Sequence, residues 1–217
     1  MRALMAAAFL FGAATAAQGQ DMPRITEALQ RNFPERHAEL AGKLAGETPA
    51  NARQVVSETM DRFLEDYRAD IVAAPGPRLI AVEADAGRML RALGRQDMAF
   101  CAVVGDRGFF SPEALDGAPP PGLDDYGAAL IEAAAAGRGR AAPQKAALED
   151  VTDWLAHVAR REPGIPVKDF LSDRELRRTA SDAQLCGGAA VMHEAVSDLP
   201  AESAARMAAM LVGAQLQ

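Results

Sequence analysis

The chain has 217 residues and a formal charge of −7, from 30 acidic and 23 basic side chains. This acidic balance excludes the basic surface on which nucleic-acid binding depends, so no nucleic-acid partner is predicted. With its first 17 residues removed, the chain is still long enough for one domain with a substantial core.

The N-terminal segment MRALMAAAFLFGAATAAQGQ has the three parts of a secretory signal peptide: basic Arg2, an apolar run, and small residues suited to cleavage. The run is shorter than the ~20 residues that a membrane-spanning helix needs. We predict a signal peptide over residues 1–17, no membrane span after cleavage, and a periplasmic or secreted product; an uncleaved anchor is the alternative. The preference for arginine over lysine is typical of bacterial genes of high GC content.

Helix signals follow this segment. The most pronounced is TPANARQVVSETMDRFLEDYRADIVAA, where Thr48 can cap the helix, Pro49 suits its first turn, and apolar residues recur every three to four positions. The next stretch repeats the pattern up to an expected stop at Gly94. The first half of the chain therefore predicts helices over about residues 25–33, 34–46, 48–74 and 78–94.

The middle of the chain holds one ambiguous element and one loop. DMAFCAVVG is short and apolar, so periodicity does not separate helix from strand, and we favour a short helix. GDRGFFSPEALDGAPPPGLDD predicts a long irregular connection. Capping boxes are expected at Ser172 with Glu175 and at Ser181 with Gln184. The second half predicts helices over about residues 124–136, 143–161, 173–180, 182–198 and 200–214.

These elements predict an all-α fold. We expect one domain over residues 18–217, a bundle of eight to eleven helices with one long Gly/Pro-rich loop. The alternative is an α+β fold with short strands near 78–84 and 98–104. No internal repeat occurs at a fixed period, so a helical solenoid is not predicted.

The two cysteines, Cys101 and Cys186, are predicted to form one disulfide, because an isolated pair in an exported chain has an oxidising environment. Free reactive or metal-binding thiols are the alternative. Gly187 and Gly188, directly after Cys186, are expected to make room for another backbone.

The stretch QLCGGAAVMHEA suggests a reactive site but does not provide a metal or catalytic constellation. On a helix, Cys186 and His193 lie about 10.5 Å apart along the axis, too far to share one metal ion. Ser197 stands where an H-E-x-x-H motif has its second histidine, and no nucleophile turn surrounds any serine. We predict that His193 lies at the margin of a buried face, and no catalytic, cofactor or metal residues are assigned.

A second polar group lies in LEDVTDWLAHVARRE. Asp150, Asp153 and His157 fall opposite the apolar face of the predicted helix, so a solvated surface is expected rather than a cation site. Trp154 is expected to be a core or interface anchor.

Phe109 and Phe110 are the candidate interaction residues. Adjacent aromatic residues in a Gly/Pro-rich loop can either fold onto the core as a plug or present an exposed anchor to a partner or a membrane surface.

The sequence therefore favours an exported, non-enzymatic interaction or structural module with an envelope or periplasmic protein partner. An enzyme of undetected class and a carrier with a cavity between helices for a small ligand are the alternatives. No cofactor is predicted.

Overall fold

The computed structural model of the protein describes residues 22–109, 120–141 and 143–216, and in these ranges it is helical, with no strand. The predicted all-α fold is confirmed, with eleven α-helices in the described ranges. The elements are α2 (Pro23–Asn32), α3 (Pro34–Leu44), α4 (Pro49–Val72), α5 (Gly76–Gln96), α6 (Met98–Arg107), α8 (Leu123–Gly137), α9 (Leu148–Arg161), α10 (Val167–Ser172), α11 (Arg174–Arg178), α12 (Asp182–Glu194), the 3₁₀ turn η1 (Ala195–Asp198) and α13 (Ala201–Gln215). Residues 78–84 lie in α5 and 98–104 in α6, so the alternative with strands is wrong.

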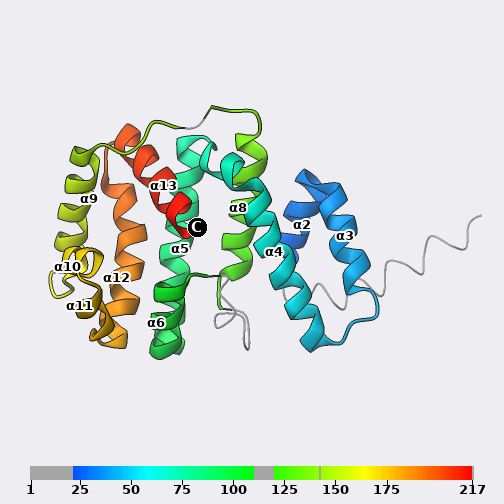
Figure 1. The fold of residues 1–217 in the computed structure, drawn as a ribbon, viewed down its shortest axis with the longest axis horizontal. Coiled ribbons are helices and arrows are strands. Elements are labelled where there is room, and N and C mark those ends of the chain that lie inside the picture. The colour runs from blue at the N-terminus through cyan, green and yellow to red at the C-terminus, as the bar shows by residue number, and fades with distance from the viewer. Residues whose placement is uncertain (1–21, 110–119, 142, 217) are drawn as a thin grey trace, which may run out of the picture.

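Helix α5 lies at the centre of the bundle (Figure 1). It packs against α6, α8, α12 and α13, while α8 continues the packing to α2 and α4. The apolar stripe predicted from the sequence provides this contact, since Leu79, Val82, Ala86 and Leu90 are all buried. Helices α2 and α3 form the opposite end of the molecule from α9 to α11 (Figure 1).

Helices α4 and α8 approach closely where α8 ends at Gly137. A Cβ atom at this position would lie 1.8 Å from the backbone oxygen of Asp70, in α4. No side chain fits in that space, so the absence of a side chain sets the distance between the two helices.

Side-chain caps define several of the helix ends. Thr48 accepts a hydrogen bond from the backbone N–H of Asn51, as predicted. Ser181 and Gln184 form the predicted capping box, with Gln184 Oε1 accepting from the Ser181 backbone N–H. The box predicted at Ser172 is wrong, because Asp173 caps α11 instead.

The start of α9 was also predicted wrongly. The helix begins at Leu148 rather than at residue 143, because the carboxylate of Asp150 accepts a hydrogen bond from the backbone N–H of Ala147 at 2.8 Å. This contact satisfies a backbone donor at the helix start.

The disulfide joins Cys101 in α6 to Cys186 in α12, with the sulfur atoms 2.02 Å and the Cα atoms 5.2 Å apart. Room for it comes from α5, where a Cβ at Gly94 would lie 2.7 Å from the Cys186 sulfur. Helix α5 continues past Gly94 to Gln96, so the stop predicted at Gly94 is wrong. Gly187 and Gly188 face the side chain of Ile165 rather than the backbone that carries Cys101.

Within the described ranges, no helix combines the length and apolar character needed to cross a bilayer. The predicted signal peptide over 1–17 lies outside these ranges, as do Phe110 and residues 111–119 of the predicted Gly/Pro-rich loop; residues 105–107 and 123–125 of that loop are helical, in α6 and α8.

Candidate functional site

Four helices bring polar side chains together in the interior. Glu83 comes from α5, Tyr126 from the first turns of α8, His193 from the last turn of α12, and Gln215 from the end of α13. Glu83 is inside because it lies one helical turn after Leu79, on the face of α5 that packs against the other helices.

The centre of this group is a hydrogen-bonded pair, a buried carboxyl group and an imidazole. Oε2 of Glu83 lies 2.6 Å from Nδ1 of His193, and the Glu83 side chain is completely buried. At this distance the carboxyl oxygen and the ring nitrogen share one hydrogen bond. His193 is only 8% exposed, so the predicted marginal position is wrong. The second carboxylate oxygen, Oε1, is buried without a hydrogen-bond partner.

Gln215 connects this pair to Tyr126. Its Nε2 lies 3.3 Å from Nδ1 and 3.4 Å from Nε2 of His193, and its Oε1 accepts a hydrogen bond from the Tyr126 hydroxyl at 2.6 Å. Burial, together with the charge of Glu83, raises the pKa of Tyr126 well above its ordinary value. Tyr126 therefore stays a neutral phenol that can donate a hydrogen bond.

Phe109 covers the network from the side of the predicted loop. Its ring centroid lies 4.7 Å from that of Tyr126 and 5.7 Å from that of His193, and its side chain is buried. Of the two predicted alternatives, Phe109 occupies the plug position. An interaction role for Phe109 and Phe110 as a pair stays a prediction.

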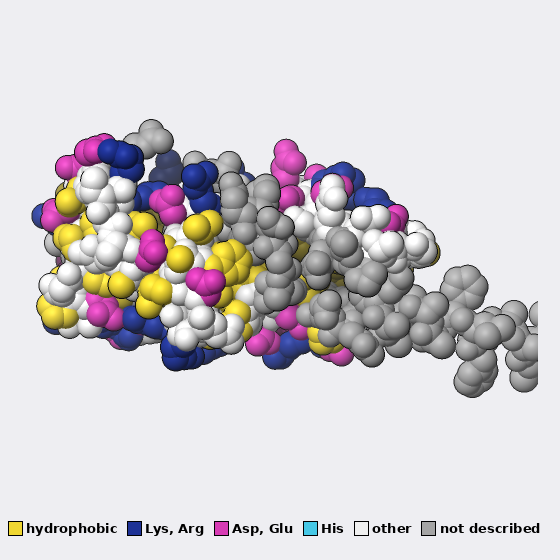
Figure 2. Space-filling model, turned by 90° about the horizontal axis from the view of Figure 1, so that it is seen from below, with side chains coloured by type: hydrophobic (Ala, Val, Ile, Leu, Met, Phe, Trp, Pro, Cys, Tyr) yellow, Lys and Arg dark blue, Asp and Glu magenta, His cyan; other side chains and the backbone are white. Residues whose placement is uncertain are grey.

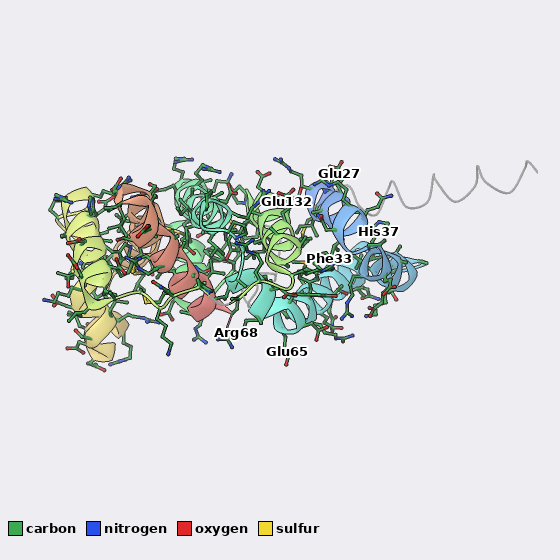
Figure 3. The ribbon with its side chains drawn as sticks, turned by 90° about the horizontal axis from the view of Figure 1, so that it is seen from above. Glu27, Phe33, His37, Glu65, Arg68 and Glu132 are labelled. Atoms are coloured by element: carbon green, nitrogen blue, oxygen red, sulfur yellow. A yellow bond between two sulfur atoms is a disulfide. The ribbon has the colours of Figure 1, made fainter. Side chains whose placement is uncertain are left out.

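A cavity of about 490 Å³ opens directly beside this network, a volume within the range of small-molecule sites. It lies between α4, the end of α6, α8 and the end of α13. In Figure 3, Glu65 and Arg68 extend from α4 on the side where α13 ends. The lining residues are Asp61, Leu64, Glu65, Arg68, Arg107, Gly108, Phe109, Tyr126, Gln215 and Leu216.

The lining combines apolar surface with hydrogen-bonding and charged groups. Leu64, Leu216 and Phe109 present apolar surface, and Tyr126 and Gln215 present hydrogen-bonding groups. Among the lining residues that the structure describes there is no serine, threonine or cysteine to act as a nucleophile. The described ranges also hold no group of three or more potential metal ligands.

The polar group predicted on α9 separates into buried and exposed residues. Asp153 is exposed and His157 is half-buried, 3.6 Å from Asp198. Asp150 is buried, which contradicts the predicted solvated position, because Arg206 in α13 pairs with both of its carboxylate oxygens at 2.7 and 2.8 Å. Trp154 is buried, and its indole N–H donates to the Met192 carbonyl, so it is a core anchor.

The pair of Asp150 and Arg206 should make stability depend on pH in acid. Hydrogen bonds from Arg206, Ser203 and the Ala147 backbone hold the pKa of Asp150 far below its ordinary value of 3.8. A depressed folded-state pKa contributes stability above the unfolded value, and this contribution is lost as pH falls below about 4. We expect Asp150→Asn to cost about 2–3 kcal/mol at pH 7 and clearly less, though not zero, at pH 2, because the folded-state pKa of Asp150 lies below that pH; urea unfolding at both values measures the difference.

The matched control for this experiment is Asp153→Asn, which removes an exposed carboxylate from the same helix. It should change the free energy of unfolding by less than about 0.5 kcal/mol at either pH. A cost of Asp150→Asn that did not decrease in acid would refute the ion-pair explanation.

Comparison of the chain with protein-family models, curated proteins and solved structures finds no match.

Proposed function

We propose that the chain is an exported, non-enzymatic binding protein that holds a small ligand in the cavity beside Tyr126 and Gln215. The observation that carries the proposal is the cavity itself, whose lining combines apolar side chains with two fixed hydrogen-bonding groups. Gln215 is held by His193 and Tyr126, so its amide is oriented before a ligand arrives.

Two features support export. The first 17 residues have the layout of a signal peptide, and the disulfide between Cys101 and Cys186 is typical of an oxidising compartment. The periplasm or the cell exterior is the location that fits both.

The described lining residues include no serine, threonine or cysteine, which supports binding rather than acyl transfer to one of these side chains. His193 and Glu83, the groups best suited to proton transfer, are in contact with each other behind the lining rather than among the lining residues.

A neutral dye tests the proposal. We expect Nile red to bind the wild-type chain with increased fluorescence and Leu216→Trp to weaken that binding at least tenfold, because an indole at this position fills part of the cavity. Leu171→Glu, on α10, is the control and should leave the fluorescence unchanged. Dye binding that is insensitive to Leu216→Trp would overturn the proposal.

A protein-partner surface is the second candidate, favoured by a separate apolar groove. Hydrophobic side chains gather on the face seen in Figure 2. In the groove between α6, α10, α11 and α12, Leu171 is 54% exposed, and Val167, Phe170 and Met192 contribute further apolar surface. Dye binding that is lost in Leu171→Glu and kept in Leu216→Trp would favour this candidate.

A further inference from the structure

We infer that a small cleft between α3 and α4 binds a monatomic anion of halide size. The cleft is separate from the cavity of the proposed function and shares no lining residue with it, so neither proposal depends on the other. Three features support the inference: a buried hydroxyl group that lacks a partner, an excess of cationic side chains, and a volume that admits one small ligand.

The hydroxyl group belongs to Thr59 in α4. Thr59 is 8% exposed and lines the cleft together with the apolar side chains of Leu29, Met60 and Phe63. Among the described residues, its Oγ1 is buried without a hydrogen-bond partner. Because a buried hydroxyl that forms no hydrogen bond destabilises a protein, this group indicates a ligand that accepts a hydrogen bond from it.

Three cationic side chains line the same cleft. Arg36 and Lys43 come from α3, and Arg62 comes from α4, one turn after Thr59. Glu39 is the one carboxylate among the described lining residues. The three cations share it, since its carboxylate oxygens lie 2.6 Å from Nζ of Lys43, 3.2 Å from Nη1 of Arg36 and 3.9 Å from Nη1 of Arg62.

The positive charge of this group exceeds the negative charge. Arg36 also pairs with Asp66, which does not line the cleft. In the ion pairs that the described residues form here, three cations therefore share two carboxylates, and Arg62 has the longest contact. Hydrogen bonds from Lys43 and Arg36 lower the pKa of Glu39, so this carboxylate is already ionised and one positive charge is left over.

The volume of the cleft restricts the ligand to a single heavy atom. It is about 10 Å³, the space of one water-sized sphere. Phosphate, sulfate and organic acids are too large for it. A halide is only slightly larger than water, and the partly exposed side chains of Lys43 and Arg62 can move to admit it. Unlike water, a halide neutralises charge and accepts every hydrogen bond that the cleft offers.

A bound anion would hold α3 against α4. Helix α3 lies beside α4 at the end of the molecule that α2 and α3 form (Figure 1). Its one buried residue is Leu40, so apolar packing alone attaches it weakly. The cations on the two helices repel each other across the contact, and an anion between them replaces this repulsion with attraction.

The direct test is the line width of ³⁵Cl NMR in the presence of the oxidised mature chain, because exchange with a protein site broadens the chloride signal. Bromide should displace chloride and narrow the line, whereas gluconate at equal ionic strength should not, since it does not fit. Thr59→Val with Arg62→Gln should weaken chloride binding roughly tenfold, because a hydrogen-bond donor and a cation are removed. The control is Arg160→Gln, which removes an exposed arginine from α9 and should leave chloride binding unchanged.

Thermal unfolding of Thr59→Val separates an anion from an ordered water. In sodium chloride we expect the variant to melt roughly 2–4 °C below wild type, because it loses the stabilisation that a bound ligand gives. In sodium gluconate of equal ionic strength it should melt at or above the wild-type temperature, because valine removes a buried hydroxyl that then has no partner.

Two outcomes would overturn the inference. If Thr59→Val melts below wild type by the same amount in both salts, the cleft holds a water molecule rather than an anion. If Thr59→Val with Arg62→Gln broadens the chloride line as much as wild type, chloride binds elsewhere on the chain. Nile red binding reports on the other cavity, so neither outcome changes the result for the proposed function.

Discussion

Replacing both cysteines, Cys101→Ala with Cys186→Ala, is expected to lower the free energy of unfolding by about 2–5 kcal/mol. The disulfide ties α6 to α12 across a sequence separation of 85 residues, so its removal frees a long loop in the unfolded chain. Both cysteines are buried, and the sulfur of Cys186 that fills the space beside Gly94 in α5 would be lost as well. Urea unfolding of oxidised wild type and of the double variant measures the difference.

Reduced wild type separates the two contributions. It lacks the cross-link but keeps both sulfur atoms in the core, so its loss should be smaller than that of the double alanine variant by the packing contribution. Intact mass before and after reduction and alkylation confirms the oxidation state of each sample. A loss below about 1 kcal/mol in both samples would show that the cross-link contributes little.

The helices were predictable where local chemistry decides their ends. Thr48 and Ser181 cap as the sequence indicates, because a side-chain oxygen three residues before a free N–H needs no distant partner. The predictions that failed depend on contacts between helices. The stop predicted at Gly94 is wrong because the glycine makes room for the sulfur of Cys186 in α12 rather than ending α5. The start predicted for α9 is wrong because Asp150, held by Arg206 of α13, accepts the backbone N–H of Ala147 and so fixes the helix start there.

The candidate site was less predictable, although one signal was present. Glu83 falls four residues after Leu79 and three before Ala86, so it occupies the apolar stripe of its own helix. A carboxylate in that position indicates a buried partner. The identity of the partner was not available, because His193 is 110 residues away and Gln215 ends the last helix.

The second large effect is expected at the buried pair of Glu83 and His193. His193→Phe should lower the free energy of unfolding by about 3–5 kcal/mol, because it leaves a completely buried carboxylate without its partner. Glu83→Leu should cost less, about 1–3 kcal/mol, since His193 keeps the neighbouring amide of Gln215. Urea unfolding at pH 7 measures each variant.

The double variant, Glu83→Leu with His193→Phe, should recover most of this loss, because apolar side chains of similar volume can replace both partners of a buried polar pair at little cost. Strict additivity of the two single effects would contradict the pairing. A double variant that unfolds like wild type would also show that stability does not require the pair. His193 also contacts Gln215, which lines the cavity, so we expect the same double variant to bind Nile red more weakly than wild type. Recovered stability with weakened binding would assign the buried pair to positioning the cavity wall.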